Sequence, residues 1–154
     1  MICVFLADGF EPMEAVVAVD ILRRAECDVK TIGIGKKEIE SANGIKILAE
    51  LEDKDINISD IDAIILPGGM PGAVNLQNSS FLTSAILSCN KEKKIIAAIC
   101  AAPIVLGRLG ILQGKKATCF RGFEGSLEGA SISSNDICID GNIITANGPL
   151  VALD

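Results

Sequence analysis

The sequence predicts an α/β fold built on a mostly parallel sheet that helices cover on both faces. Strand-like and helix-like segments alternate along the chain, and the buried strand candidates are apolar throughout. Strands of that kind are typical of parallel sheets enclosed between two helical layers. With 154 residues, the chain is expected to form one domain, 1–154, with a full hydrophobic core.

The expected elements follow one another in a regular order. A turn leads to Pro12, which suits the first position of a helix that begins acidic and ends basic. Ser79 or Ser80 can cap a second helix. The strands are expected at 2–7, 29–34, 63–67, 95–99 and 116–120, the helices at 12–24, 80–91 and 101–112, and two hairpins at 39–48 and 137–145.

The composition argues against several classes of partner. Fourteen basic and 20 acidic residues give a net charge of −6, which disfavours nucleic-acid binding because phosphate backbones attract cationic surfaces. No apolar run is long enough to span a membrane, and the first residues lack the basic leader of a signal peptide. The six cysteines contain no Cys-x-x-Cys pair, so we expect neither a zinc ribbon nor a dithiol motif, and a reducing cytoplasm as the location.

The chain has no histidine. This excludes a Ser-His-Asp triad, a Cys-His dyad and histidine-ligated metal sites within one chain, and no metal site is expected. The acid–base partner of any reactive thiol must therefore be a carboxylate, a lysine, an arginine or water.

Cys100 stands where a buried strand passes directly into a helical pattern. The strand 95–99 ends at this cysteine, and Ala101-Ala102-Pro103 follows it. A thiol in that place meets unpaired backbone N–H groups and the positive end of a helix dipole, both of which favour the thiolate. The small residues leave room for a tight nucleophile elbow. The alternative is an inert cysteine within an apolar core.

Three segments together resemble a known family. They are Asp8-Gly9-Phe10-Glu11-Pro12-Met13-Glu14, Leu66-Pro67-Gly68-Gly69 and Ala98-Ile99-Cys100-Ala101-Ala102-Pro103. In this order and spacing they resemble the ThiJ/PfpI family, most closely the branch that contains the parkinsonism-associated protein deglycase. The resemblance implies a flavodoxin-like three-layer sandwich, a homodimer, no cofactor, and a nucleophilic cysteine at a strained strand-to-helix elbow.

The resemblance also implies a set of site residues. Cys100 matches the reactive cysteine, and Glu14 matches the glutamate that hydrogen-bonds its sulfur. Gly69 matches the residue whose backbone N–H faces a substrate oxyanion, and Ala101 is expected to help at the same place. A carboxyl and a thiol in contact share one proton as a coupled pair, so Glu14 could act as a general acid.

Each of these residues also has a simpler explanation. Acidic residues such as Glu14 are common in first helical turns because of the helix dipole alone. Glu11 competes for the role of Glu14, being nearer the turn and able to cap the helix. Gly68 and Gly69 fit a tight turn that needs positive φ.

The chain departs from the family pattern in two places. Many relatives carry a histidine shortly after the strand at 116–120, where this chain has Phe120; Arg121 or Glu124 could compensate. The family also continues into a C-terminal helix, which this sequence is expected to lack, and Leu150 stands where relatives usually have glycine. An exposed apolar patch is expected where that helix would lie.

Two functional hypotheses use the same residues. The first is a cofactor-free glyoxalase or deglycase acting on a small carbonyl substrate, with Cys100 as nucleophile, Glu14 as proton shuttle and Gly69 at the oxyanion. The second is an oxidative-stress sensor or chaperone-like protein in which Cys100 oxidises to a sulfinate. A flavin-binding carrier ranks third, because the aromatic residues that would sandwich a flavin are scarce.

Overall fold

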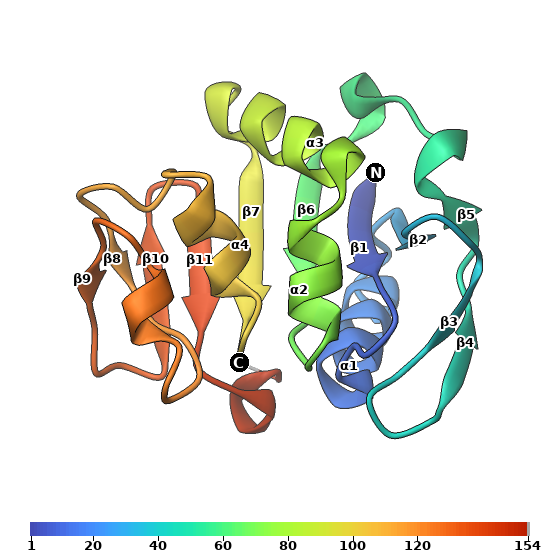
Figure 1. The fold of residues 1–154 in the computed structure, drawn as a ribbon. Coiled ribbons are helices and arrows are strands. Elements are labelled where there is room, and N and C mark those ends of the chain that lie inside the picture. Colours follow the sequence, from blue (N-terminus) through green and yellow to red (C-terminus); the bar gives the residue numbers. More distant parts are fainter. Residues whose placement is uncertain (154) are drawn as a thin grey trace.

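The computed structural model describes residues 1–153 and has a seven-stranded sheet at its centre (Figure 1). Neighbouring strands pair in parallel except at one edge, where a hairpin adds an antiparallel strand. In spatial order the strands are β10 (Ile137–Asp140), β11 (Ile143–Ala146), β7 (Ile95–Ile99), β6 (Ala63–Leu66), β1 (Ile2–Leu6), β2 (Val29–Gly33) and β5 (Leu51–Glu52).

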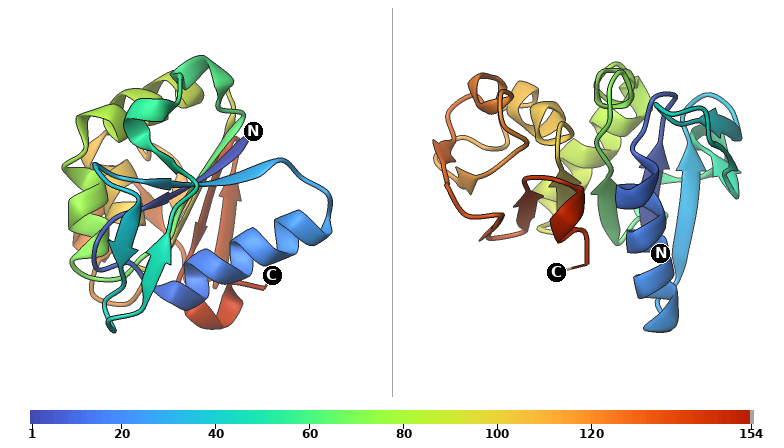
Figure 2. Two further views of the ribbon diagram at one scale, coloured as in Figure 1. Left: turned by 90° about the vertical axis from the view of Figure 1, so that its right-hand side faces the viewer. Right: turned by 90° about the horizontal axis from the view of Figure 1, so that it is seen from below.

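Helices cover both faces of the sheet, so the predicted α/β three-layer fold is confirmed (Figure 2). One face carries α2 (Gly72–Gln77), α3 (Ser80–Lys91) and α4 (Pro103–Arg108), and the other carries α1 (Pro12–Arg24). Two small sheets lie beside the main one: the hairpin of β3 (Glu38–Glu40) with β4 (Lys46–Leu48), and the pair of β8 (Lys116–Ala117) with β9 (Ser131–Ile132). Within residues 1–153, no helix combines the length and the apolar character needed to cross a membrane.

The core lies in two layers because successive side chains of a strand point to opposite faces. In β1, Cys3 and Phe5 join the larger cluster with residues of α2, α3 and α4, whereas Val4 and Leu6 pack with Ala15 of α1. All four strand residues are fully or almost fully buried. Strand β1 therefore packs against the helices on both faces of the sheet, as expected for a run without polar positions.

Five expectations about element length are wrong. The strand expected at 116–120 ends at Ala117, because the Thr118 N–H donates to the Thr145 hydroxyl and the Phe120 N–H to the Cys100 carbonyl. The helix expected at 101–112 covers only Pro103–Arg108, and Gly110 then takes a positive φ of 70°. The strands expected at 2–7, 29–34 and 63–67 each end one residue earlier, at Leu6, Gly33 and Leu66. The short helix α2 is an element that the sequence patterns did not reveal.

An apolar groove of about 250 Å³ crosses the face of the sheet that carries α1. Glu14 and Ala18 of α1 form one side, and the 3-10 turn η4 (Pro149–Val151) and the residue after it form the other. Strands β6, β7, β10 and β11 contribute its floor, and Ile139 on the edge strand is 71% exposed.

Candidate functional site

Cys100 occupies a sharp turn at the carboxyl end of β7. Its φ of +62° lies in the left-handed region, which residues with a side chain seldom adopt and which often marks a functional site. Two backbone hydrogen bonds of 2.8 Å hold it there: its N–H donates to the Ala146 carbonyl, and its carbonyl accepts from the Phe120 N–H. The neighbouring strand β11 and the segment after β8 therefore fix the strained turn.

The sulfur of Cys100 faces two backbone donors, the N–H groups of Ala101 and Gly69. Gly68 allows this close approach, because a Cβ on it would lie 2.7 Å from the Cys100 Cβ and 2.9 Å from the Ala101 nitrogen. The loop after β6 is thus pressed against the turn after β7. Parallel neighbouring strands bring their carboxyl ends to one edge of the sheet, where ligand sites of such folds gather.

Glu14 reaches the same place from the first turn of α1. The residue is only 2% exposed, and its Oε2 accepts a 2.7 Å hydrogen bond from the Gly68 N–H. Its Oε1 is buried and has no hydrogen-bond partner among the described residues. The Cys100 thiol lies beside the carboxyl, and each group shifts the pKa of the other. A buried carboxyl with one free oxygen beside a thiol can accept or return a proton.

Burial raises the pKa of both groups, and Glu14 raises that of the Cys100 thiol further. Burial raises the pKa of Glu14, and the Gly68 N–H and the Cys100 thiol offset this only in part. Burial, and next the negative charge of Glu14, raise the pKa of the Cys100 thiol to about 12 against the N–H donors of Ala101 and Gly69. The expectation of a lowered thiol pKa is therefore wrong for the resting pair. The six-residue helix α4 adds little dipole to reverse it.

The pair can nevertheless form a thiolate in one way. Two adjacent buried anions are disfavoured, so an ionised Cys100 requires that Glu14 carry the proton. The protonated carboxyl then donates to the sulfur, and the N–H groups of Ala101 and Gly69 stabilise the same charge. Deprotonation of Cys100 is thus coupled to proton transfer to Glu14.

The remaining residues expected at the site lie at its edges. Glu11 caps α1, since its Oε1 accepts from the Met13 N–H at 3.2 Å, and only its backbone reaches the site by donating to the Gly68 carbonyl. Phe120 is 47% exposed and its ring lies against Gly148. Within residues 1–153, no cluster of three or more carboxylates, cysteines or histidines could hold a metal ion.

Known proteins are similar in sequence to this chain along nearly all of its length. The sequence model of the DJ-1/PfpI family matches residues 1–154. The chain belongs to the DJ-1/PfpI family. The family resemblance carried by the three segments around Cys100 is thereby confirmed.

Named relatives of the family differ in how much of their length this chain covers. Protein DJ-1 homolog B of Arabidopsis thaliana is 39% identical over 147 residues, which are 94% of this chain but 34% of that protein. Protein dj-1beta of Drosophila melanogaster is 32% identical over 154 residues, or 98% of this chain and 82% of that protein. The chain therefore spans about a third of the plant relative and most of the fly one.

Solved structures of DJ-1 proteins have the same fold. Oxidized Toxoplasma gondii DJ-1 has a TM-score of 0.94 at 32% identity, covering 99% of this chain and 84% of that one. Drosophila melanogaster DJ-1beta has a TM-score of 0.91 at 33% identity, covering 98% and 83%. The sheet order and the layers described above are thus those of the DJ-1/PfpI family.

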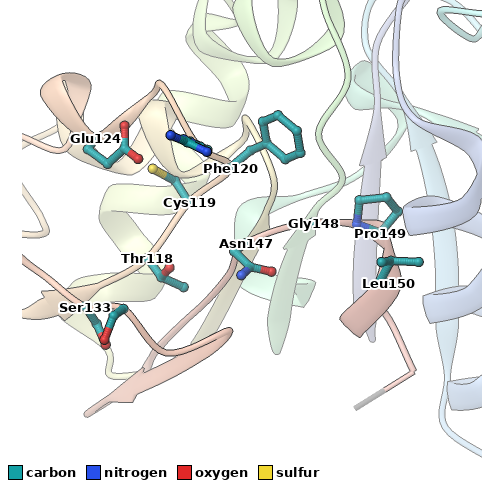
Figure 3. A pocket seen from close by; sticks show the side chains of 11 residues that line it. Thr118, Cys119, Phe120, Glu124, Ser133, Asn147, Gly148, Pro149 and Leu150 are labelled. Carbon is teal, nitrogen blue, oxygen red and sulfur yellow. The ribbon is translucent and has the colours of Figure 1, made fainter.

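A second feature of this DJ-1/PfpI chain lies next to Cys100 and was missed in the sequence. An open cavity of about 490 Å³ is lined by residues 118–121, 124, 133–134 and 147–150 (Figure 3). It adjoins Cys100 through Phe120 and through Ala146, which precedes the segment 147–150. One feature of the sequence could have indicated this cavity: the segment 147–150 directly follows a strand of the parallel sheet, and ligands of such folds bind at the carboxyl ends of the strands.

Proposed function

We propose that this chain is a cofactor-free, cysteine-dependent enzyme that acts on small α-oxoaldehydes or their adducts, as a glyoxalase or deglycase. One observation carries the proposal: the carboxyl of the buried Glu14 lies beside the half-buried thiol of Cys100, where the N–H groups of Ala101 and Gly69 favour the thiolate. Such a pair supplies a nucleophile, a general acid and donors for a developing oxyanion within one contact distance.

The reaction of methylglyoxal can be written with these groups alone. Cys100 passes its proton to Glu14, and the sulfur attacks the aldehyde carbon. The carbonyl oxygen becomes an alkoxide that accepts hydrogen bonds from the Gly69 and Ala101 N–H groups, and Glu14 returns the proton to it. The carboxylate of Glu14 then removes the proton from the former aldehyde carbon, and the ketone oxygen becomes the oxygen of an enediol as it takes up a proton. Glu14 returns a proton to the adjacent carbon while the hydroxyl on the former aldehyde carbon loses its own, which leaves a lactoyl thioester on Cys100. Water hydrolyses the resulting thioester, which releases lactate and restores the thiol.

The rate is expected to be low because one carboxyl performs every proton transfer. General acid–base help contributes about 10²–10⁴-fold in rate, and no histidine is available to share the work. The raised pKa of the Cys100 thiol also keeps the thiolate scarce at neutral pH. We therefore expect slow turnover without added metal or thiol.

The test is conversion of methylglyoxal to lactate by the wild type and by Cys100→Ser. The wild type should produce lactate and Cys100→Ser none. Cys27→Ser serves as the matched control, because Cys27 is a free cysteine on the far end of α1 and should leave the rate unchanged. Absence of lactate with the wild type, or equal rates for the wild type and Cys100→Ser, would overturn the proposal.

An oxidation sensor is the second candidate, supported by the same donors. Backbone N–H groups of Ala101 and Gly69 and a protonated Glu14 could stabilise the oxygens of a Cys100 sulfinate. Mild peroxide should then add two oxygens to Cys100 before any other cysteine, as read by peptide mass spectrometry. Prior oxidation of Cys3 or Cys119, which are both buried, would count against this candidate.

A homodimer in a reducing cytoplasm completes the proposal. All six cysteines are free, and an apolar surface extends over α1 and the β3–β4 hairpin, where Met13 is 53%, Val16 50% and Leu48 74% exposed. A hollow between Val16 and Leu48 shows that these elements adjoin. Light scattering should report a dimer that Val16→Asp weakens, whereas a monomeric wild type would contradict the assignment.

A further inference from the structure

The cavity beside Cys100 is formed by three segments that follow strands. Residues 118–124 come after β8, 133–134 after β9, and 147–150 after β11. Its volume of about 490 Å³ falls within the range of about 300–1,000 Å³ that is usual for small-molecule sites. Phe120 is the wall it shares with the Cys100 turn, since its N–H binds the Cys100 carbonyl.

Two opposite charges line this cavity without neutralising each other. Arg121 and Glu124 both contribute to the lining, and within residues 1–153 neither takes part in an ion pair. Glu124 is held in place, because its Oε2 accepts from the Gly122 N–H at 2.8 Å. Burial and, next, the charge of Glu124 raise the pKa of the Cys119 thiol in the cavity wall to about 11. The negative charge of Glu124 is therefore felt by groups in the cavity wall.

Neutral hydrogen-bonding groups surround the two charges. Ser133 accepts from the Asn135 N–H through its hydroxyl oxygen, which leaves the hydroxyl proton free to donate. The Asn147 amide nitrogen donates to Asp136 at 2.6 Å, which fixes the amide and leaves its oxygen as an acceptor. Figure 3 shows Glu124 and the Cys119 sulfur at one end of the cavity, with Pro149 and Leu150 at the other.

We propose that this cavity binds a small zwitterion, an α-amino acid, with its carboxylate on Arg121 and its ammonium on Glu124. A guanidinium pairs well with a carboxylate because it offers parallel N–H donors. An anion alone would face Glu124, and a cation alone would face Arg121, so a ligand with both charges matches the lining best. The proposal concerns binding and goes beyond the proposed turnover at Cys100.

The experiment is a titration of the full chain with three small molecules, in which binding is measured by backbone amide NMR and by calorimetry. The probes are L-alanine, L-alaninamide, which lacks the carboxylate, and N-acetyl-L-alanine, which lacks the ammonium. L-Alanine should bind saturably and shift the amide signals of Gly122 and Gly148, and each analogue should bind at least tenfold more weakly. Arg121→Gln and Glu124→Gln should each weaken L-alanine binding at least tenfold.

Arg108 and Glu128 provide a matched control pair. They line a different hollow of about 350 Å³, so Arg108→Gln and Glu128→Gln should leave L-alanine binding unchanged. Cys100→Ser should also bind normally, which separates this proposal from the proposed enzyme activity. The proposal is overturned if L-alanine does not bind up to millimolar concentration, if either analogue binds equally well, or if the cavity variants retain full affinity.

Discussion

The two sides of Cys100 differ in how tightly they are packed. On the closed side, residues 9–14 press against residues 68–72, so that a Cβ on Gly9 or Gly69 would lie 2.5 Å from atoms of the facing segment. On the open side, residues 118–124 and 147–150 line a cavity that is open to solvent, and Phe120 and Leu150 are 47% and 89% exposed. The closed side holds the proton of the Glu14–Cys100 pair in place, whereas the open side has room for ligands of different shape.

The largest effect is expected from adding a single methyl group to the closed side. In Gly68→Ala, the new Cβ would lie 2.7 Å from the Cys100 Cβ and 2.9 Å from Glu14 Oε2. Overpacking of this kind costs about 1–3 kcal/mol of unfolding free energy, and it should abolish turnover by separating the pair. Thermal denaturation and the lactate assay measure both effects. In Gly125→Ala, directly after the open-side segment 118–124, the new Cβ meets nothing within 4 Å. This variant should change neither stability nor turnover, and equal losses in the two variants would show that the comparison is wrong.

A smaller change should alter the proton distribution without disturbing the packing. Glu14→Gln removes the negative charge that helps to raise the pKa of the Cys100 thiol to about 12. The thiol pKa should therefore fall, and iodoacetamide should alkylate Cys100 several-fold faster at pH 8, while turnover drops because the proton shuttle is lost. In the wild type, alkylation should rise steadily with pH up to that high pKa.

Glu11→Gln is the control for this prediction. It keeps an oxygen that can accept from the Met13 N–H at the start of α1, so the alkylation profile should match that of the wild type. If Glu11→Gln shifts the pH profile of alkylation more than Glu14→Gln does, then Glu11, and not Glu14, is the carboxyl that exchanges a proton with Cys100.

The open side should accept a new functional group with little loss of stability. Phe120→His places an imidazole beside the Cys100 turn, and a second base is expected to raise turnover by up to about 10²-fold. Phe120→Leu, which adds no base, should leave the rate near that of the wild type. An unchanged rate in Phe120→His would mean that this position does not reach the substrate.

The smallest effect is expected at Leu150, the most exposed apolar residue of the open side. Leu150→Ser should change the unfolding free energy by less than about 0.5 kcal/mol, because the side chain is 89% exposed. Urea denaturation of both proteins measures the difference. A loss above 1 kcal/mol would indicate that Leu150 is buried by another surface in solution.

The closed side was largely predictable from the sequence, because its signals are local. Pro12 marks the start of α1, Gly68 and Gly69 mark the tight loop, and the apolar run before Cys100 marks the strand end. The cavity on the open side was not predictable, since residues 118–123 form neither a helix nor a strand and only a short 3-10 turn, Glu124–Ser126, follows them. Thr118 binds the hydroxyl of Thr145, a contact between distant segments that no periodicity reveals.

The raised pKa of the thiol escaped prediction for a related reason. The sequence pattern around Cys100 indicates the N–H donors that lower the pKa of its thiol. It does not show the burial and the carboxylate of Glu14, which raise that pKa by more. Glu14 lies 86 positions before Cys100 in the sequence, and its bond to Gly68 joins residues 54 positions apart. Only the assembled sheet brings these three together.

The burial of Cys100 also links the chemistry of one sulfur atom to the folding equilibrium of the whole chain. In the unfolded chain this thiol has an ordinary pKa of about 8.5, whereas the folded state raises it to about 12. Ionisation therefore favours the unfolded state, so the contribution of the protonated thiol to stability is complete below pH 8.5 and is lost as the pH rises toward 12. The urea concentration at the midpoint of unfolding should therefore fall as the pH rises from about 8.5 toward 12.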